Sequence, residues 1–142
     1  MNITGKWTYR SYNNDPALVG GDANKALALI FGEGIMTLTV GYGGAIHGTF
    51  DMGGGYLMDL MGLVKPNTSP VTVTMEGKGR ANTPTAGWIY DYLGYAVPAW
   101  PHGVHQRDAI VGSVIRAVPH NGQPAGVTAS TIMVRDDVGR AR

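Results

Sequence analysis

Hydroxyl-bearing and aromatic residues alternate along two segments of the chain, a spacing typical of a binding cavity. The two sets are Tyr9, Ser11 and Asn13, and Trp88, Tyr90 and Tyr92. Because successive residues of a strand point to opposite faces, the members of each set share one face. Buried phenol groups require hydrogen-bond partners, which a ligand can supply. We therefore expect the first set, together with Tyr90, to orient a ligand by hydrogen bonds.

Apolar side chains extend this expected cavity. Phe50 and Met52 lie on the same face as Ile46 in the glycine-bounded segment 41–55, and Trp100 stands in the Pro- and Gly-containing loop 98–107. An apolar cavity with a few polar groups is the usual form of a small-molecule site. We expect Phe50 and Met52 to line the cavity and Trp100 to cover its mouth as part of a lid. The alternative is that the aromatic and apolar side chains simply fill the interior.

One acidic and one basic residue complete the candidate chemistry. Asp59 interrupts segment 56–64, which is otherwise apolar on both faces, so a buried Asp59 would need a cation. Arg116, in phase with Ile110 and Val114, is its expected partner. Such a pair either stabilises the fold or anchors an anion or carbonyl group of a ligand. In an enzyme, the candidate catalytic residues would be Tyr9, Arg116 and Asp59.

Several other chemistries find little support. His102 and His105 form H-x-x-H, but the chain has no cysteine and no H-E-x-x-H, so we expect no metal site. It contains neither G-x-S-x-G nor a phosphate-binding G-x-x-x-x-G-K, and we expect no cofactor. With 11 basic and 10 acidic residues, the net charge of +1 gives no electrostatic case for nucleic acid or an anionic membrane.

The elements that must position these residues are short strands with tight turns. The 142 residues include 22 glycines and eight prolines. Strands are predicted at 3–13 and 35–40, between the two glycine clusters of segment 41–55, and at 56–64, 71–80, 86–97, 108–118 and 127–136, and segment 26–31 could be a ninth strand or one helical turn. Gly48, midway along an inward face, suits a curved wall or a close ligand.

Short connections between these strands favour antiparallel neighbours. We predict a single all-β domain over residues 1–142, an antiparallel up-and-down barrel of about eight strands, with a two-sheet sandwich as the alternative.

Three segments resemble calycin barrels. ITGKW at 3–7 resembles the opening G-x-W strand of the avidin branch, and MTLTVGYGGAIHGTF at 36–50 is similar to that branch's second hairpin. DYLGY at 91–95 resembles the D-Y-x-x-Y signature of lipocalins. The resemblance implies a calycin-like barrel with a ligand in its open mouth and assembly as a dimer or tetramer. Since Phe50 and Met52 stand where avidins place polar groups, it implies a ligand more hydrophobic than a ureido ring.

The leading prediction is therefore the binding of a small apolar or aromatic molecule in the open end of the barrel. An alternative is a cofactor-independent enzyme, of the cyclase or isomerase type, acting on an unsaturated hydrophobic substrate. A third is a structural module that forms homo-oligomers through the doubly apolar segment 56–64. The N-terminus shows no signal peptide pattern, and the sequence is interpreted as that of a soluble cytoplasmic protein.

Overall fold

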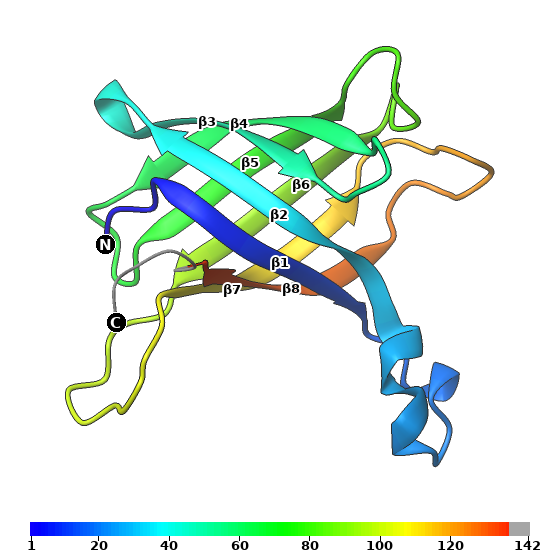
Figure 1. Ribbon diagram of the computed structural model, residues 1–142, viewed down its shortest axis with the longest axis horizontal. Coiled ribbons are helices and arrows are strands. Elements are labelled where there is room, and N and C mark those ends of the chain that lie inside the picture. The colour runs from blue at the N-terminus through cyan, green and yellow to red at the C-terminus, as the bar shows by residue number, and fades with distance from the viewer. Residues whose placement is uncertain (137–142) are drawn as a thin grey trace.

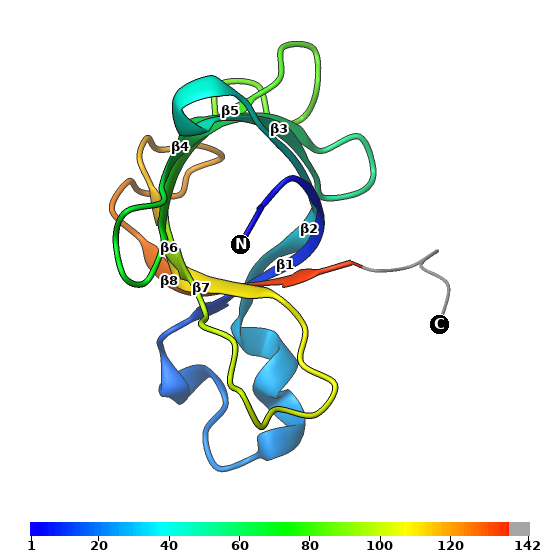
Figure 2. The same ribbon diagram turned by 90° about the vertical axis from the view of Figure 1, so that its left-hand side faces the viewer.

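The computed structural model, which describes residues 1–136, is a closed barrel of eight antiparallel strands (Figures 1 and 2). The strands are β1 (Gly5–Asn13), β2 (Ile30–Val40), β3 (Ala45–Asp51), β4 (Leu57–Lys65), β5 (Thr72–Gly79), β6 (Ile89–Ala96), β7 (Ala109–Arg116) and β8 (Thr128–Arg135). Each strand pairs with the next in sequence, and β8 pairs with β1. The predicted up-and-down barrel is confirmed, and closure leaves no free sheet edge.

Three short 3₁₀ helices accompany the strands: η1 (Pro16–Leu18), η2 (Ala23–Leu29) and η3 (Tyr42–Gly44). Segment 26–31, which the sequence left open between strand and helix, is divided between the end of η2 and the beginning of β2. Strand β2 therefore begins earlier than predicted, with a register shift opposite Ser11 and Tyr12. None of the helices within residues 1–136 is long and apolar enough to cross a membrane.

The end of the barrel at which β1 begins is closed by Trp7. Its side chain is fully buried, and its indole Nε1 donates a hydrogen bond of 2.9 Å to the Ile3 carbonyl oxygen. The Arg135 guanidinium lies over the indole ring, 4.4 Å from its centroid. In Figure 2 the N-terminal segment lies inside the ring of strands at this end, where Ile3 is buried. We refer to it as the closed end and to the opposite end as the open end.

Inward and outward residues alternate along the strands as predicted. Side chains of Met36, Leu38, Ile46, Leu60 and Met75 are buried together and fill the lumen towards the closed end. Every second residue of these strands is therefore apolar because its side chain packs inside the barrel.

Glycines occupy one or more inward positions on most strands, and they bring neighbouring backbones close together. A Cβ on Gly48 would lie 2.3 Å from the Thr37 carbonyl oxygen of β2, and one on Gly112 would lie 1.9 Å from the Leu93 carbonyl oxygen of β6. The missing side chain at Gly48 therefore serves the curved wall of the barrel, because the close neighbour is backbone.

Candidate ligand-binding site

A small cavity lies inside the open end of the barrel. Its volume is about 60 Å³, and its lining is largely aromatic: Tyr9, Ser11, Phe31, Gly32, Phe50, Met52, Met58, Trp88, Tyr90, Tyr92 and Val114. Such a volume holds a few water molecules and is well below the roughly 300–1,000 Å³ of pockets for drug-sized ligands. The cavity therefore admits only a compact group.

Trp88 and His120 lie together at the mouth of this cavity. Their rings stack with centroids 4.0 Å apart and an interplanar angle of 14°. Trp88 immediately precedes β6, and His120 belongs to the connection between β7 and β8, so two segments far apart in sequence meet here. Both rings are partly buried, and together they cover part of the mouth.

A chain of hydrogen bonds links Arg116, Tyr90 and His120. Arg116 Nε donates to Tyr90 Oη at 3.1 Å, and Tyr90 Oη lies 2.6 Å from His120 Nε2. Because the guanidinium can only donate, we assign the Tyr90 hydroxyl hydrogen to His120 Nε2. His120 then carries its proton on Nδ1, which is buried and has no hydrogen-bond partner within residues 1–136.

Burial and the nearby charge of Arg116 both hold the pKa of His120 below its ordinary value of 6.5. The imidazole is therefore neutral near pH 7, which agrees with its accepting the hydrogen bond from Tyr90. Deeper in the cavity, burial raises the pKa of Tyr9 and of Tyr92 above the ordinary phenol value, so both phenols stay protonated.

Arg116 is an inward-facing charged residue at the end of β7. It is only 7% exposed, and its guanidinium lies 5.1 Å from the centroid of Phe31 and 5.9 Å from that of Tyr90. Its Nη1 donates to the Pro124 carbonyl oxygen at 3.2 Å. No carboxylate of the described part of the chain forms an ion pair with it.

The structure brings most of the predicted site residues together. Seven of them line the cavity: Tyr9, Ser11, Phe50, Met52, Trp88, Tyr90 and Tyr92. Asn13 is half-buried at the open end of β1 but does not line the cavity. Trp88, Tyr90 and Tyr92 share one face, as do Tyr9 and Ser11, because alternation depends only on the local extended backbone.

The prediction that Trp100 and loop 98–107 form a lid is wrong. This loop joins the end of β6 to the beginning of β7 and lies at the closed end, on the same side as the N-terminus (Figure 1). Trp100 is 64% exposed there. In an up-and-down barrel alternate connections lie at opposite ends, so the order of the strands decides which loops reach the mouth.

The expected pair between Asp59 and Arg116 is also wrong. Met58 and Leu60 point into the barrel, so Asp59 between them points outward, where it is exposed. Its carboxylate pairs with Arg80, with Nη2 and Oδ1 2.7 Å apart, and this bond lowers the pKa of Asp59. Arg116 faces inward on another part of the wall.

Sequence reasoning missed His120 at the mouth and four of the lining residues, Phe31, Gly32, Met58 and Val114. His120 lies in a segment predicted only as a turn, and Phe31 lies in the segment whose secondary structure was left open. Neither has a periodic pattern that marks it as inward, because each is placed by a connection or by a strand end. Among residues 1–136 there is no group of three His, Asp or Glu side chains able to hold a metal ion.

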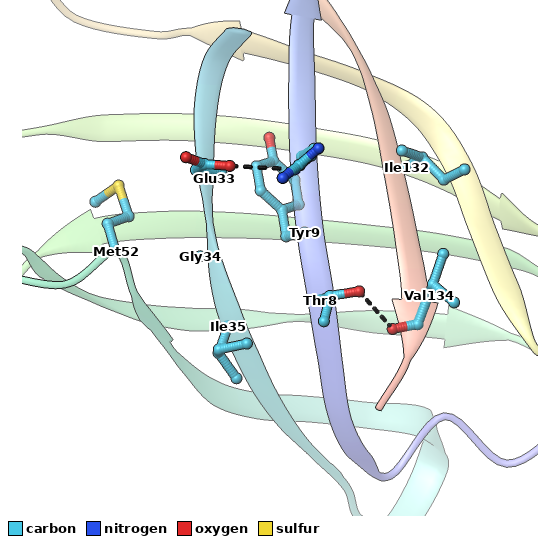
Figure 3. A pocket seen from close by; sticks show the side chains of 9 residues that line it. Thr8, Tyr9, Glu33, Gly34, Ile35, Met52, Ile132 and Val134 are labelled. Atoms are coloured by element: carbon cyan, nitrogen blue, oxygen red, sulfur yellow. Dashed lines mark hydrogen bonds and ion pairs between the residues drawn. The ribbon is translucent and has the colours of Figure 1, made fainter. Parts of the chain in front are cut away.

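A wider hollow of about 550 Å³ lies over β8, β1 and β2 (Figure 3). It is larger than the cavity in the lumen, but it is open and its polar groups already bind one another. Arg10 pairs with Glu33 at 3.1 Å, and Thr8 Oγ1 donates to the Val134 carbonyl oxygen at 3.1 Å. The lumen cavity is therefore the stronger candidate, because it lies inside the barrel and its lining is largely aromatic with a few hydroxyl groups.

The chain matches no protein-family model, no curated protein and no solved structure. What fold and site define together is a closed eight-stranded antiparallel barrel with a small aromatic cavity at one end.

Proposed function

We propose that this protein binds a small apolar or aromatic molecule in the open end of a calycin-like barrel. The observation that carries the proposal is the cavity itself, a partly enclosed space inside the open end with aromatic walls. Buried apolar side chains pack together in the lumen below it, so a ligand would enter from the open end.

The resemblance to calycin barrels supports the same function. Eight antiparallel strands close in sequential order, and the tryptophan of the G-x-W segment, Trp7, closes the end opposite the cavity. Phe50 and Met52 line the cavity and make it more apolar than the avidin pattern would. With a volume of about 60 Å³, the cavity limits the ligand to a compact molecule of at most about one aromatic ring.

Binding can be tested with phenol and indole as neutral probes. We expect either probe to perturb the NMR signals of the Trp88 indole N–H and the Met58 methyl group, both of which belong to cavity-lining residues. Substitution Gly32→Leu should abolish these changes, because a Cβ on Gly32 would make ordinary van der Waals contact with Ser11 Oγ, at 3.4 Å, and the longer side chain then occupies the cavity.

Gly21→Leu is the matched control. Gly21 is exposed in the connection between η1 and η2, and a Cβ there would meet no atom within 4 Å. The control should bind the probes like the wild-type protein. Absence of binding by both probes to the wild-type protein, or equal binding by Gly32→Leu, would reject the proposed site.

Catalysis on an unsaturated substrate is a second candidate function. The hydrogen-bond chain from Arg116 through Tyr90 to His120 favours it, because donors fixed in a buried site can stabilise charge that develops during a reaction. Turnover lost in Arg116→Ala and in Tyr9→Phe, with the fold intact, would support an enzyme. Unchanged turnover in both variants would remove these residues from the mechanism.

Self-association of the barrel is the remaining alternative, and the exposed apolar residues of its outer surface would form the subunit interface. Met61 on β4 and Leu93 on β6 are 61% and 54% exposed, and Leu63 and Tyr95 on the same strands are also exposed. These residues face outward on both sides of β5, with Thr74 between Leu63 and Leu93 in register. A second copy of the chain is the partner that this alternative requires, and the oligomeric state tests it.

A further inference from the structure

Arg116 places a positive charge beside the cavity that the described part of the chain does not neutralise. Its hydrogen bonds go to a phenol oxygen and to a backbone carbonyl oxygen, and the nearest ring faces belong to Phe31 and Tyr90. A charge that is 93% buried without a counter-ion is costly, and buried charges in proteins are commonly paired. The position therefore suits an anion supplied from outside the chain.

We infer that the ligand carries a compact anionic group, such as a carboxylate, which Arg116 binds while the apolar part of the ligand lies among the aromatic rings below. This inference rests on the proposed function and specifies its ligand class. Arg116 is adjacent to the cavity because Phe31 and Tyr90, which its guanidinium contacts, both line it. Val114, two residues earlier on the same face of β7, lines the cavity as well.

The donors around the mouth match an acceptor-only ligand group. Arg116 uses Nε for Tyr90 and Nη1 for Pro124, which leaves Nη2 for an incoming oxygen. His120 Nδ1 is a second nitrogen without a partner, and in the assigned tautomer it is a donor. A carboxylate ion has two acceptor oxygens and no donor, and it pairs with guanidinium groups through strong hydrogen bonds.

The deeper lining adds no competing negative charge. No Asp or Glu lines the cavity, and the polar side-chain groups of its lining are the hydroxyls of Tyr9, Ser11, Tyr90 and Tyr92 and the indole N–H of Trp88. The raised pKa values of Tyr9 and Tyr92 keep those two phenols uncharged at neutral pH. An anionic head group at the mouth with an apolar body beneath it satisfies both parts of the site.

A purely structural role for Arg116 is the competing explanation. Its bond to the Pro124 carbonyl oxygen holds the connection between β7 and β8, and Tyr90 orients its guanidinium. This role predicts that removing Arg116 lowers stability without changing which ligands bind. Discrimination between a charged and a neutral ligand of one shape separates the two explanations.

Benzoate and benzamide make that comparison at pH 7, where the first is an anion and the second is its neutral near-isostere. We expect the wild-type protein to bind benzoate at least about tenfold more tightly, by calorimetry or NMR titration, since only the anion forms a charge-assisted pair with Arg116. In Arg116→Met the ratio of the two dissociation constants should fall to about one. Arg80→Met is the control, because Arg80 lies at the same end of the barrel but is already paired with Asp59; its ratio should equal that of the wild type.

The outcomes separate the inference from the proposed function. Equal affinities for benzoate and benzamide in the wild-type protein would reject the inference of an anionic ligand, while the proposed site for a neutral ligand would remain supported. A ratio that persists in Arg116→Met, or that falls as much in Arg80→Met, also overturns the role of Arg116. If benzoate, benzamide, phenol and indole all fail to bind the wild-type protein, the proposed function is rejected. If Arg116→Met does not fold, the wild-type comparison still decides whether the site prefers an anion.

Discussion

Replacing Tyr90 by phenylalanine tests whether the hydrogen-bond chain at the mouth stabilises the protein. The substitution keeps the ring, which packs edge-on against Phe31 and Trp88, and removes the hydroxyl that links Arg116 to His120. A hydrogen bond to a charged group contributes about 1.5–3 kcal/mol and a neutral one about 0.5–1.5 kcal/mol. We expect Tyr90→Phe to lower the free energy of unfolding by about 2–4 kcal/mol.

Urea unfolding at pH 7, followed by tryptophan fluorescence, measures this change. With a slope of about 2 kcal/mol per molar urea, the midpoint should fall by about 1–2 M. The same substitution at Tyr42, which is fully exposed, should change the free energy of unfolding by less than about 0.5 kcal/mol. Equal midpoints for Tyr90→Phe and Tyr42→Phe would refute the reasoning, because the hydroxyl of Tyr90 would then stabilise nothing that water cannot replace.

Three further outcomes test the wall, the mouth and the outer face. Gly112→Ala should lower the free energy of unfolding by about 2–3 kcal/mol, since its Cβ would lie 1.9 Å from the Leu93 carbonyl oxygen; Gly32→Ala, whose Cβ would meet Ser11 Oγ at 3.4 Å, should change it by less than about 1 kcal/mol. Equal denaturation midpoints would contradict this account of the wall. Stability should decrease as pH falls below about 6.5, because the folded state holds the pKa of His120 under its unfolded value and the unfolded chain therefore binds the proton more readily. His120→Gln should flatten this part of the pH profile, and an unaltered profile would assign the effect to other groups. Leu93→Lys should reduce the mass found by light scattering, and a wild-type monomer at high concentration would show that the outer face is not a subunit interface.

Much of the barrel could be predicted from the sequence. The inward positions of Trp7, Tyr9 and Phe50 were predicted, and all three are buried; for segment 86–97 the sequence left the inward face open, and the structure shows that it is the face of Tyr90 and Tyr92. Alternation is a local property of extended backbone, so the residues themselves reveal the inward face once one apolar member is known. The number of strands followed from glycine- and proline-containing turns between apolar runs.

The partners of the charged residues could not be predicted in the same way. Asp59 was expected to meet Arg116, but the register between β4 and β5 places it beside the end of β5, where Arg80 follows. Sequence shows that a residue is charged and on which strand it stands. Which charge faces it depends on the pairing of strands and on the face to which the residue points.

The class of fold and the sets of residues that share a strand face could be read from the sequence, because both follow from local periodicity and short connections. The cavity volume of about 60 Å³, the place of Trp100 at the closed end, and the contact of His120 with Tyr90, 30 residues away, depend on the tertiary structure. The cavity volume is the space that many packed side chains leave unfilled. The contact of His120 with Tyr90 depends on barrel closure and on the path of the connection between β7 and β8. Neither quantity is encoded in the spacing of neighbouring residues.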